Sequence, residues 1–103
     1  MRKIHVLSLM TAVALAVTPA LAEGPADYKA KCQMCHAADA SGNTPAGKKL
    51  GAKDLKLPET KNKTDTELVA IVRDGKNKMP SFKEKLNAQQ MQELVTFIRK
   101  LAK

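Results

Sequence analysis

The sequence predicts an all-α domain of about three to five short helices joined by long loops. Two segments in its C-terminal half repeat apolar residues at helical spacing, and capping residues bound both of them. No segment alternates apolar and polar residues over the roughly four to eight positions typical of a strand. The 103-residue chain has only three aromatic residues and no Trp. A domain this small rarely builds a secure core from side chains alone, so we expect a further group to hold it together.

The first residues have the layout of a secretory signal peptide. Arg2 and Lys3 give a positive start, an apolar run extends from Val6 to Val17, and a small-x-small cleavage pattern ends at Ala22. The run is shorter than the roughly 20 residues that span a bilayer as a helix. We therefore expect residues 1–22 to be cleaved, and an uncleaved membrane anchor is the alternative.

Cleavage would leave residues 23–103 as a single exported domain. It removes Arg2 and Lys3 and no acidic residue, so the formal net charge falls from +8 to +6. We expect this domain to work in the periplasm as a monomer that does not span a membrane. Export and the shortage of aromatic residues for base stacking argue against a nucleic-acid partner.

The N-terminal part of the domain predicts one helix followed by a long loop. Pro25 suits the first turn of a helix, which we expect over Ala26 to about Met34. Between Ala38 and Pro58 glycines and prolines interrupt any periodicity, so we expect a loop with at most a helical turn near Lys48–Leu50. A connection this long is unusual in a small domain and needs something to wrap around.

A later helix has clear boundaries. Thr64 and Glu67 form a capping-box pattern, and Gly75 suits the position after a helix C-terminus. These signals predict a helix from Asp65 to Asp74.

The last helix is predicted to begin at Asn87, which pairs with Gln90 as a second capping box. We also expect a short helical turn around Lys83–Leu86. The apolar stripe of the last helix recurs at i, i+3, i+4, i+7 and i+10 and comprises Met91, Leu94, Val95, Ile98 and Leu101.

The chemistry is concentrated in a C-x-x-C-H sequence formed by Cys32, Cys35 and His36. Two thiols at this spacing can bond the two vinyl groups on one porphyrin edge, and the following histidine can place its imidazole on the iron. The pattern predicts covalent haem c attachment through the two cysteines, with His36 as an axial ligand. A redox dithiol would need a βαβ setting, and a zinc site would need four ligands where this domain offers two Cys and one His.

The second axial ligand is expected to be a methionine, because haem iron held by His and Met is an electron-transfer arrangement. Met79 lies in a loop between two predicted helices, and Pro80 biases it toward an extended conformation that helps aim its side chain. Met91 falls on the apolar stripe of the last helix, and Met34 lies between the attachment cysteines. We therefore predict that His36 and Met79 coordinate the iron.

Together these residues resemble those of the small bacterial class I c-type cytochromes, over nearly all of residues 23–103. In that family an N-terminal helix carrying a glycine and an aromatic residue crosses a C-terminal helix carrying a leucine and an aromatic residue. Gly24 and Tyr28 match the first helix, and Leu94 and Phe97 match the second. The resemblance implies a cytochrome c-like fold wrapped around one covalently attached haem.

The resemblance also implies a hydrogen bond between the axial histidine and a proline carbonyl. Pro45 is placed to accept His36 Nδ1–H, which would orient the imidazole and raise its basicity. The chain lacks the Trp that larger members use near a haem propionate. Lys53, Lys56 and Asn77 are candidate propionate partners.

With both axial positions filled, the iron would have no open site for a substrate, so we expect a soluble electron carrier and not an enzyme. The alternatives are a haem subunit of a larger redox complex, or a haem peroxidase or gas-binding protein if the Met79 ligand is labile. The apolar residues expected around the haem are Leu50, Leu55, Leu57, Leu68, Ile71, Val72, Phe82, Leu94, Val95 and Ile98.

The positive charge points to the kind of partner. Six lysines flank the attachment helix or the Met79 loop: Lys29, Lys31, Lys76, Lys78, Lys83 and Lys85. We expect this lysine-rich surface to dock on acidic patches of a reductase or terminal oxidase. A generally solvated lysine surface is the alternative.

Overall fold

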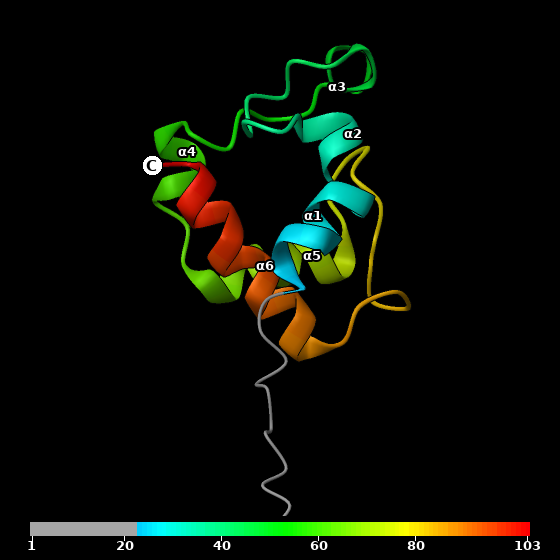
Figure 1. The fold of residues 1–103 in the computed structure, drawn as a ribbon, viewed down its shortest axis with the longest axis vertical. Coiled ribbons are helices and arrows are strands. Elements are labelled where there is room, and N and C mark those ends of the chain that lie inside the picture. The colour runs from blue at the N-terminus through cyan, green and yellow to red at the C-terminus, as the bar shows by residue number, and fades with distance from the viewer. Residues whose placement is uncertain (1–22) are drawn as a thin grey trace, which may run out of the picture.

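The computed structural model describes residues 23–103, so the predicted signal peptide over residues 1–22 lies outside the described residues. Regular structure in the described part is helical, apart from one isolated antiparallel bridge. The helices are α1 (Gly24–Lys31), α2 (Gln33–His36), α3 (Pro45–Leu50), α4 (Pro58–Lys61), α5 (Asp65–Asp74) and α6 (Ala88–Leu101). Figure 1 shows them arranged as a ring in which α2 and α4 lie on opposite sides. The all-α prediction is confirmed, with one helix more than the expected range.

Helices α1 and α6 cross in close contact. A Cβ atom built on Gly24 would lie 2.8 Å from the backbone oxygen of Glu93 and 3.3 Å from Phe97 Cβ, so the crossing leaves no room for a side chain there. The rings of Tyr28 and Phe97 meet edge to face, with centroids 5.4 Å apart and planes at 63°, a favoured aromatic geometry. The predicted crossing of the first and last helices is confirmed.

Side-chain caps define the starts of α5 and α6. Thr64 Oγ1 accepts a hydrogen bond of 3.1 Å from the Glu67 N–H. Asn87 and Gln90 form both halves of a capping box, each with a 2.8 Å hydrogen bond. Because these bonds satisfy N–H groups that a helix leaves unpaired, α5 has the predicted bounds and α6 begins directly after Asn87.

The remaining short helices differ from the expectation. The first helix ends at Lys31, and the attachment sequence continues as the separate helix α2. The turn expected near Lys48–Leu50 is the six-residue helix α3, and α4 was not predicted. Both α3 and α4 carry proline in the first turn, where its missing N–H costs nothing. The helical turn expected around Lys83–Leu86 is present as a single turn, in which the Phe82 carbonyl accepts from the N–H groups of Lys85 and Leu86, each at 2.9 Å.

The core lies between α1, α5, α6 and the segment that follows Met79. Its buried members are Tyr28, Cys32, Val72, Phe82, Leu86, Met91, Leu94 and Ile98, with Leu55, Val69, Met79, Phe97 and Leu101 packed against them. Leu68 and Val95 are also buried. Leu50 and Leu57, expected near the haem, are 42% and 49% exposed instead. Most of the predicted apolar residues therefore gather in one place, and these two do not.

Candidate haem site

The attachment sequence begins at Cys32, which lies between α1 and α2, and continues through all of α2. Cys32 is buried in the core, whereas Cys35 and His36 are half-buried, and neither cysteine is in a disulfide. The His36 N–H donates to the Cys32 carbonyl at 2.9 Å, so one helical turn separates the first thiol from the imidazole. Helix α2 and the residue directly before it thus present two free thiols and one imidazole close together.

A hydrogen bond from α1 holds the end of α2. Tyr28 Oη donates to the Ala37 carbonyl oxygen at 2.5 Å. Ala37 directly follows His36 and has φ 69° and ψ 163°, a conformation that is costly for a residue with a side chain. Burial raises the pKa of Tyr28 to about 12, so the phenol stays protonated and able to donate. The core tyrosine therefore fixes the backbone next to the predicted ligand.

The imidazole of His36 is oriented by a backbone carbonyl, but that carbonyl belongs to a different residue from the one predicted. His36 Nδ1 lies 3.0 Å from the Lys53 carbonyl oxygen. Because a carbonyl oxygen can only accept, Nδ1 carries the proton and Nε2 keeps a free lone pair. The predicted partner, Pro45, is instead in the first turn of α3, where backbone carbonyls accept bonds within the helix.

The turn that follows α2 explains why the Lys53 carbonyl reaches the imidazole. The Leu55 N–H donates to the Ala40 carbonyl at 2.8 Å, which lays residues 52–55 over the turn. A Cβ on Gly42 would lie 2.8 Å from the Ala52 carbonyl oxygen, and Gly42 has φ +76°. A glycine is required by both the close approach and the backbone angle. This acceptor could not be predicted from the sequence, because a backbone carbonyl leaves no residue-type pattern.

The Met79 loop is a tight backbone turn. Lys76 N–H donates to the Met79 carbonyl at 3.1 Å, and Met79 N–H donates to the Lys76 carbonyl at 2.9 Å. Gly75 enters the turn with φ +78°, where a Cβ would lie 2.7 Å from the Met79 oxygen. The Met79 side chain is half-buried and packs against the core cluster that contains Cys32. The turn therefore directs a thioether to the same cluster as the first attachment cysteine.

The other two methionines are placed as the sequence predicted. Met91 is only 3% exposed and lies on the buried face of α6, and Met34 is 75% exposed between the attachment cysteines. Of the three methionines in residues 23–103, Met79 alone combines a loop position with a half-buried side chain.

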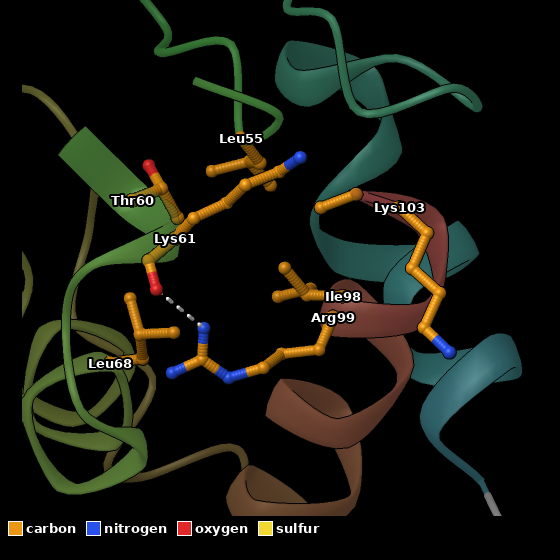
Figure 2. Close-up of a pocket in the computed structure, with 8 residues that line it drawn as sticks. Leu55, Thr60, Lys61, Leu68, Ile98, Arg99 and Lys103 are labelled. Carbon is orange, nitrogen blue, oxygen red and sulfur yellow. Dashed lines mark hydrogen bonds between the residues drawn. The ribbon is translucent and has the colours of Figure 1, made fainter. Parts of the chain in front are cut away.

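A cavity of about 180 Å³ opens on the side of the core that faces α4. Figure 2 shows Leu55, Leu68 and Ile98 around it, with the basic residues at its margin. Its lining comprises Leu55, Thr60, Lys61, Leu68, Ile98, Arg99, Ala102 and Lys103. Three of the predicted haem-contacting residues thus surround one hollow with apolar walls and a basic margin.

The described side chains fit a covalently attached haem better than the two alternatives. Burial raises the pKa of the Cys32 thiol to about 11, whereas a redox dithiol works through a thiol of lowered pKa. No group of three or more His, Cys, Asp and Glu side chains converges within residues 23–103, which leaves the zinc interpretation without a ligand set. Two adjacent thiols, a free imidazole Nε2, a core-facing thioether and an apolar cavity are the donors and the walls that haem c needs.

The lysine-rich surface is mostly unpaired. Lys31 approaches Asp27 at 3.5 Å, and Lys85 Nζ lies 5.9 Å from the centroid of the Phe82 ring. The other four members are exposed and form no salt bridge within the described part of the chain: Lys29, Lys76, Lys78 and Lys83. Their charges are therefore available to solvent or to another molecule.

Comparisons with known proteins agree with this geometry. A family model described as cytochrome C oxidase, cbb3-type, subunit III matches residues 19–98. The solved structure of the KustC0563 c-type cytochrome superposes with a TM-score of 0.68 at 31% identity, covering 78% of this chain and 98% of that one. A point mutant of Kustc0563, with phenylalanine in place of a tyrosine, gives 0.66 and 32%, covering 77% and 98%. No curated protein sequence matches.

The fold and the site define a small monohaem c-type cytochrome with a cytochrome c-like all-α fold, a haem electron-transfer protein that carries covalently bound haem c with its iron. The chain belongs to the family whose model is described as cbb3-type cytochrome c oxidase subunit III. No helix in residues 23–103 is long and apolar enough to cross a bilayer.

Proposed function

We propose that this cytochrome is a periplasmic electron carrier whose haem is attached through Cys32 and Cys35 and whose iron is held axially by His36 and Met79. The observation that carries the proposal is the 3.0 Å contact from His36 Nδ1 to the Lys53 carbonyl. It commits Nδ1 to a backbone acceptor and leaves Nε2 as the coordinating nitrogen, as is usual for a metal-bound histidine, whose other ring nitrogen donates to a carbonyl or carboxylate.

When bound, the haem iron would supply one-electron chemistry, Fe(III) to Fe(II) and back. The protein's own residues would prevent other reactions at the iron. As a ligand, Met79 would fill the position that a substrate would need, and its soft sulfur would favour the reduced ion. The hydrogen bonds on either side of His36 and across the Met79 turn hold both ligands in place. Because neither ligand has to move, electron transfer needs little rearrangement.

The lysine-rich surface supports docking on an acidic redox partner, a reductase or a terminal oxidase. Unpaired surface cations raise the rate of encounter with an acidic patch, and salt weakens that effect. Electron-transfer rates with such a partner should therefore fall steeply as ionic strength rises. Electron-transfer rates that do not change with salt would contradict docking through these lysines and would mean that they form a generally solvated surface.

A second candidate function is suggested by the family description, which names an oxidase subunit. In that case the domain would be a haem subunit of a larger redox complex. Co-purification from the native membrane separates the two: a carrier is released by salt, whereas a subunit remains with its complex.

A peroxidase or gas-binding protein would require Met79 to leave the iron, which carbon monoxide binding to the reduced protein would reveal.

Export through a cleaved signal peptide over residues 1–22 completes the proposal, and it predicts that the isolated protein begins at Glu23. The full test is a redox-difference spectrum with a potentiometric titration of that protein. We expect one haem, a single one-electron transition, and haem that stays with the polypeptide in acidified acetone. Haem released into the solvent would contradict thioether attachment.

A further inference from the structure

The cavity beside α4 has a cation at its opening that has no described partner. Figure 2 shows the Lys61 side chain running along the margin of this cavity to Leu55, whereas the Lys103 ammonium group points away from Leu55. Lys61 forms no salt bridge within residues 23–103. An apolar cavity with one unpaired ammonium group beside its opening is suited to a ligand edge that carries a carboxylate.

The other charged groups near Lys61 are already occupied. Arg99 Nε donates to Asp65 Oδ1 at 2.6 Å, and its terminal nitrogens donate to the carbonyls of Lys61 at 3.4 Å and Lys63 at 2.5 Å. Glu59 pairs with Lys53 at 3.8 Å. Three of the five Arg99 N–H donors are therefore committed to groups of the protein, and the bond to the Lys61 carbonyl holds the backbone from which the lysine side chain extends.

The position of the attachment cysteines determines which haem edge faces this cavity. In haem c the two thioether bonds lie on one edge of the macrocycle, and the two propionates leave from the opposite edge. The thioether edge belongs to Cys32 and Cys35 at α2, and α4 lies on the opposite side of the ring of helices (Figure 1). The cavity, at about 180 Å³, is smaller than the roughly 300–1,000 Å³ of a whole ligand pocket, so it suits one edge of the group.

We infer that Lys61 is the cation that pairs with a haem propionate, and that Arg99 is a positioning residue that holds the α4 backbone for it. The inference rests on the attachment and ligation set out under the proposed function. It differs from the sequence-based candidates: Lys53 is paired with Glu59, and neither Lys56 nor Asn77 lines the cavity.

The test compares Lys61→Gln with Lys103→Gln in the haem-loaded protein, because both variants lose one charge at the margin of the same cavity. We expect Lys61→Gln to raise the propionate pKa, measured from the pH dependence of the haem methyl shifts in NMR of the ferric protein. It should also lower the reduction potential, since an uncompensated carboxylate stabilises ferric iron. Lys103→Gln should change both quantities much less, and Lys61→Arg should stay close to the wild type.

Two results would overturn the inference in distinguishable ways. Equal shifts in Lys61→Gln and Lys103→Gln, with haem attachment and the sulfur–iron band intact, would reject Lys61 as the propionate partner and leave the proposed function untouched. A wild-type protein without thioether-linked haem would reject both the inference and the proposed function.

A separate variant tests the positioning role of Arg99. Arg99→Lys should shift the propionate pKa in the same direction as Lys61→Gln, and an unchanged propionate pKa would reject that role.

Discussion

Tyr28 in α1 donates a 2.5 Å hydrogen bond to the carbonyl oxygen of Ala37, the residue directly after His36. The ring of the same tyrosine packs edge to face on Phe97 of α6. One side chain therefore connects the crossing of the first and last helices to the backbone of the haem site, so that folding of the helix pair and placement of the histidine are coupled.

Replacement of Tyr28 by Phe separates these two roles, because the ring contact with Phe97 remains and the hydrogen bond is lost. The buried Ala37 carbonyl then keeps only the 3.2 Å hydrogen bond from the Ala40 N–H, and the loss of one hydrogen bond of this kind costs about 0.5–1.5 kcal/mol. We expect the free energy of unfolding in guanidinium chloride to fall by that amount, with the absorption spectrum of the haem retained. No loss of stability would show that the hydrogen bond is not formed in solution.

The ionisation of Tyr28 should make stability depend on pH in the alkaline range. Burial raises its pKa to about 12, against about 10 in an unfolded chain. The folded state therefore favours the protonated phenol, and this contribution is complete below about pH 10 and is lost as the pH rises toward 12. Because the chain has one Tyr, tyrosinate absorbance measured against Tyr28→Phe reports this group alone. Titration near pH 10 without loss of helical circular dichroism would contradict the burial.

The helix crossing predicts that Gly24→Ala is destabilising. Its Cβ would lie 2.8 Å from the Glu93 backbone oxygen, and overpacking of this kind costs about 1–3 kcal/mol. Thermal unfolding should show a clear loss for Gly24→Ala. The matched change Ala26→Ser, at an exposed position of the same helix, should stay within roughly 0.5 kcal/mol of the wild type. Equal stability of both variants would mean that the helices are further apart than described.

Relief of backbone strain beside His36 should stabilise the protein. Ala37 has φ 69° and ψ 163°, a region that costs a residue with a side chain about 1–3 kcal/mol, whereas glycine adds a smaller entropy cost of about 0.4–1 kcal/mol. We therefore expect Ala37→Gly to gain about 1 kcal/mol in denaturant unfolding. Ala38→Gly is the control, because Ala38 has no positive φ and should lose stability. A destabilised Ala37→Gly would argue against this conformation.

The sequence predicted the elements whose signals are carried by side chains. The caps at Thr64 and Asn87 located α5 and α6, whereas no pattern predicted that the helix breaks between α1 and α2. Helix α4 was missed because its single turn is too short for any apolar periodicity. Leu50 and Leu57 were expected inside because they are apolar, but both are exposed, Leu50 as the last residue of α3 and Leu57 directly before α4. Composition alone could not predict the exposure of these two leucines.

The acceptor for His36 was missed for a different reason. Every residue offers a backbone carbonyl with the same chemistry, so Lys53 carried no signal and Pro45 was chosen on resemblance alone. The approach of the 52–55 segment depends on the backbone at Ala40 and Gly42, a long-range arrangement that spacing does not reveal. The cavity beside α4 likewise needs three helices in place before it exists.

The ferric absorption spectrum of Met79→Leu, recorded beside that of Met91→Leu, tests the central claim most directly. Both changes nearly conserve side-chain volume, and only the first removes the proposed iron ligand. We expect the weak far-red band of a sulfur–iron bond in the wild type and in Met91→Leu, and its loss in Met79→Leu. A band that survives in Met79→Leu, or disappears in Met91→Leu, would contradict ligation of the haem iron by His36 and Met79.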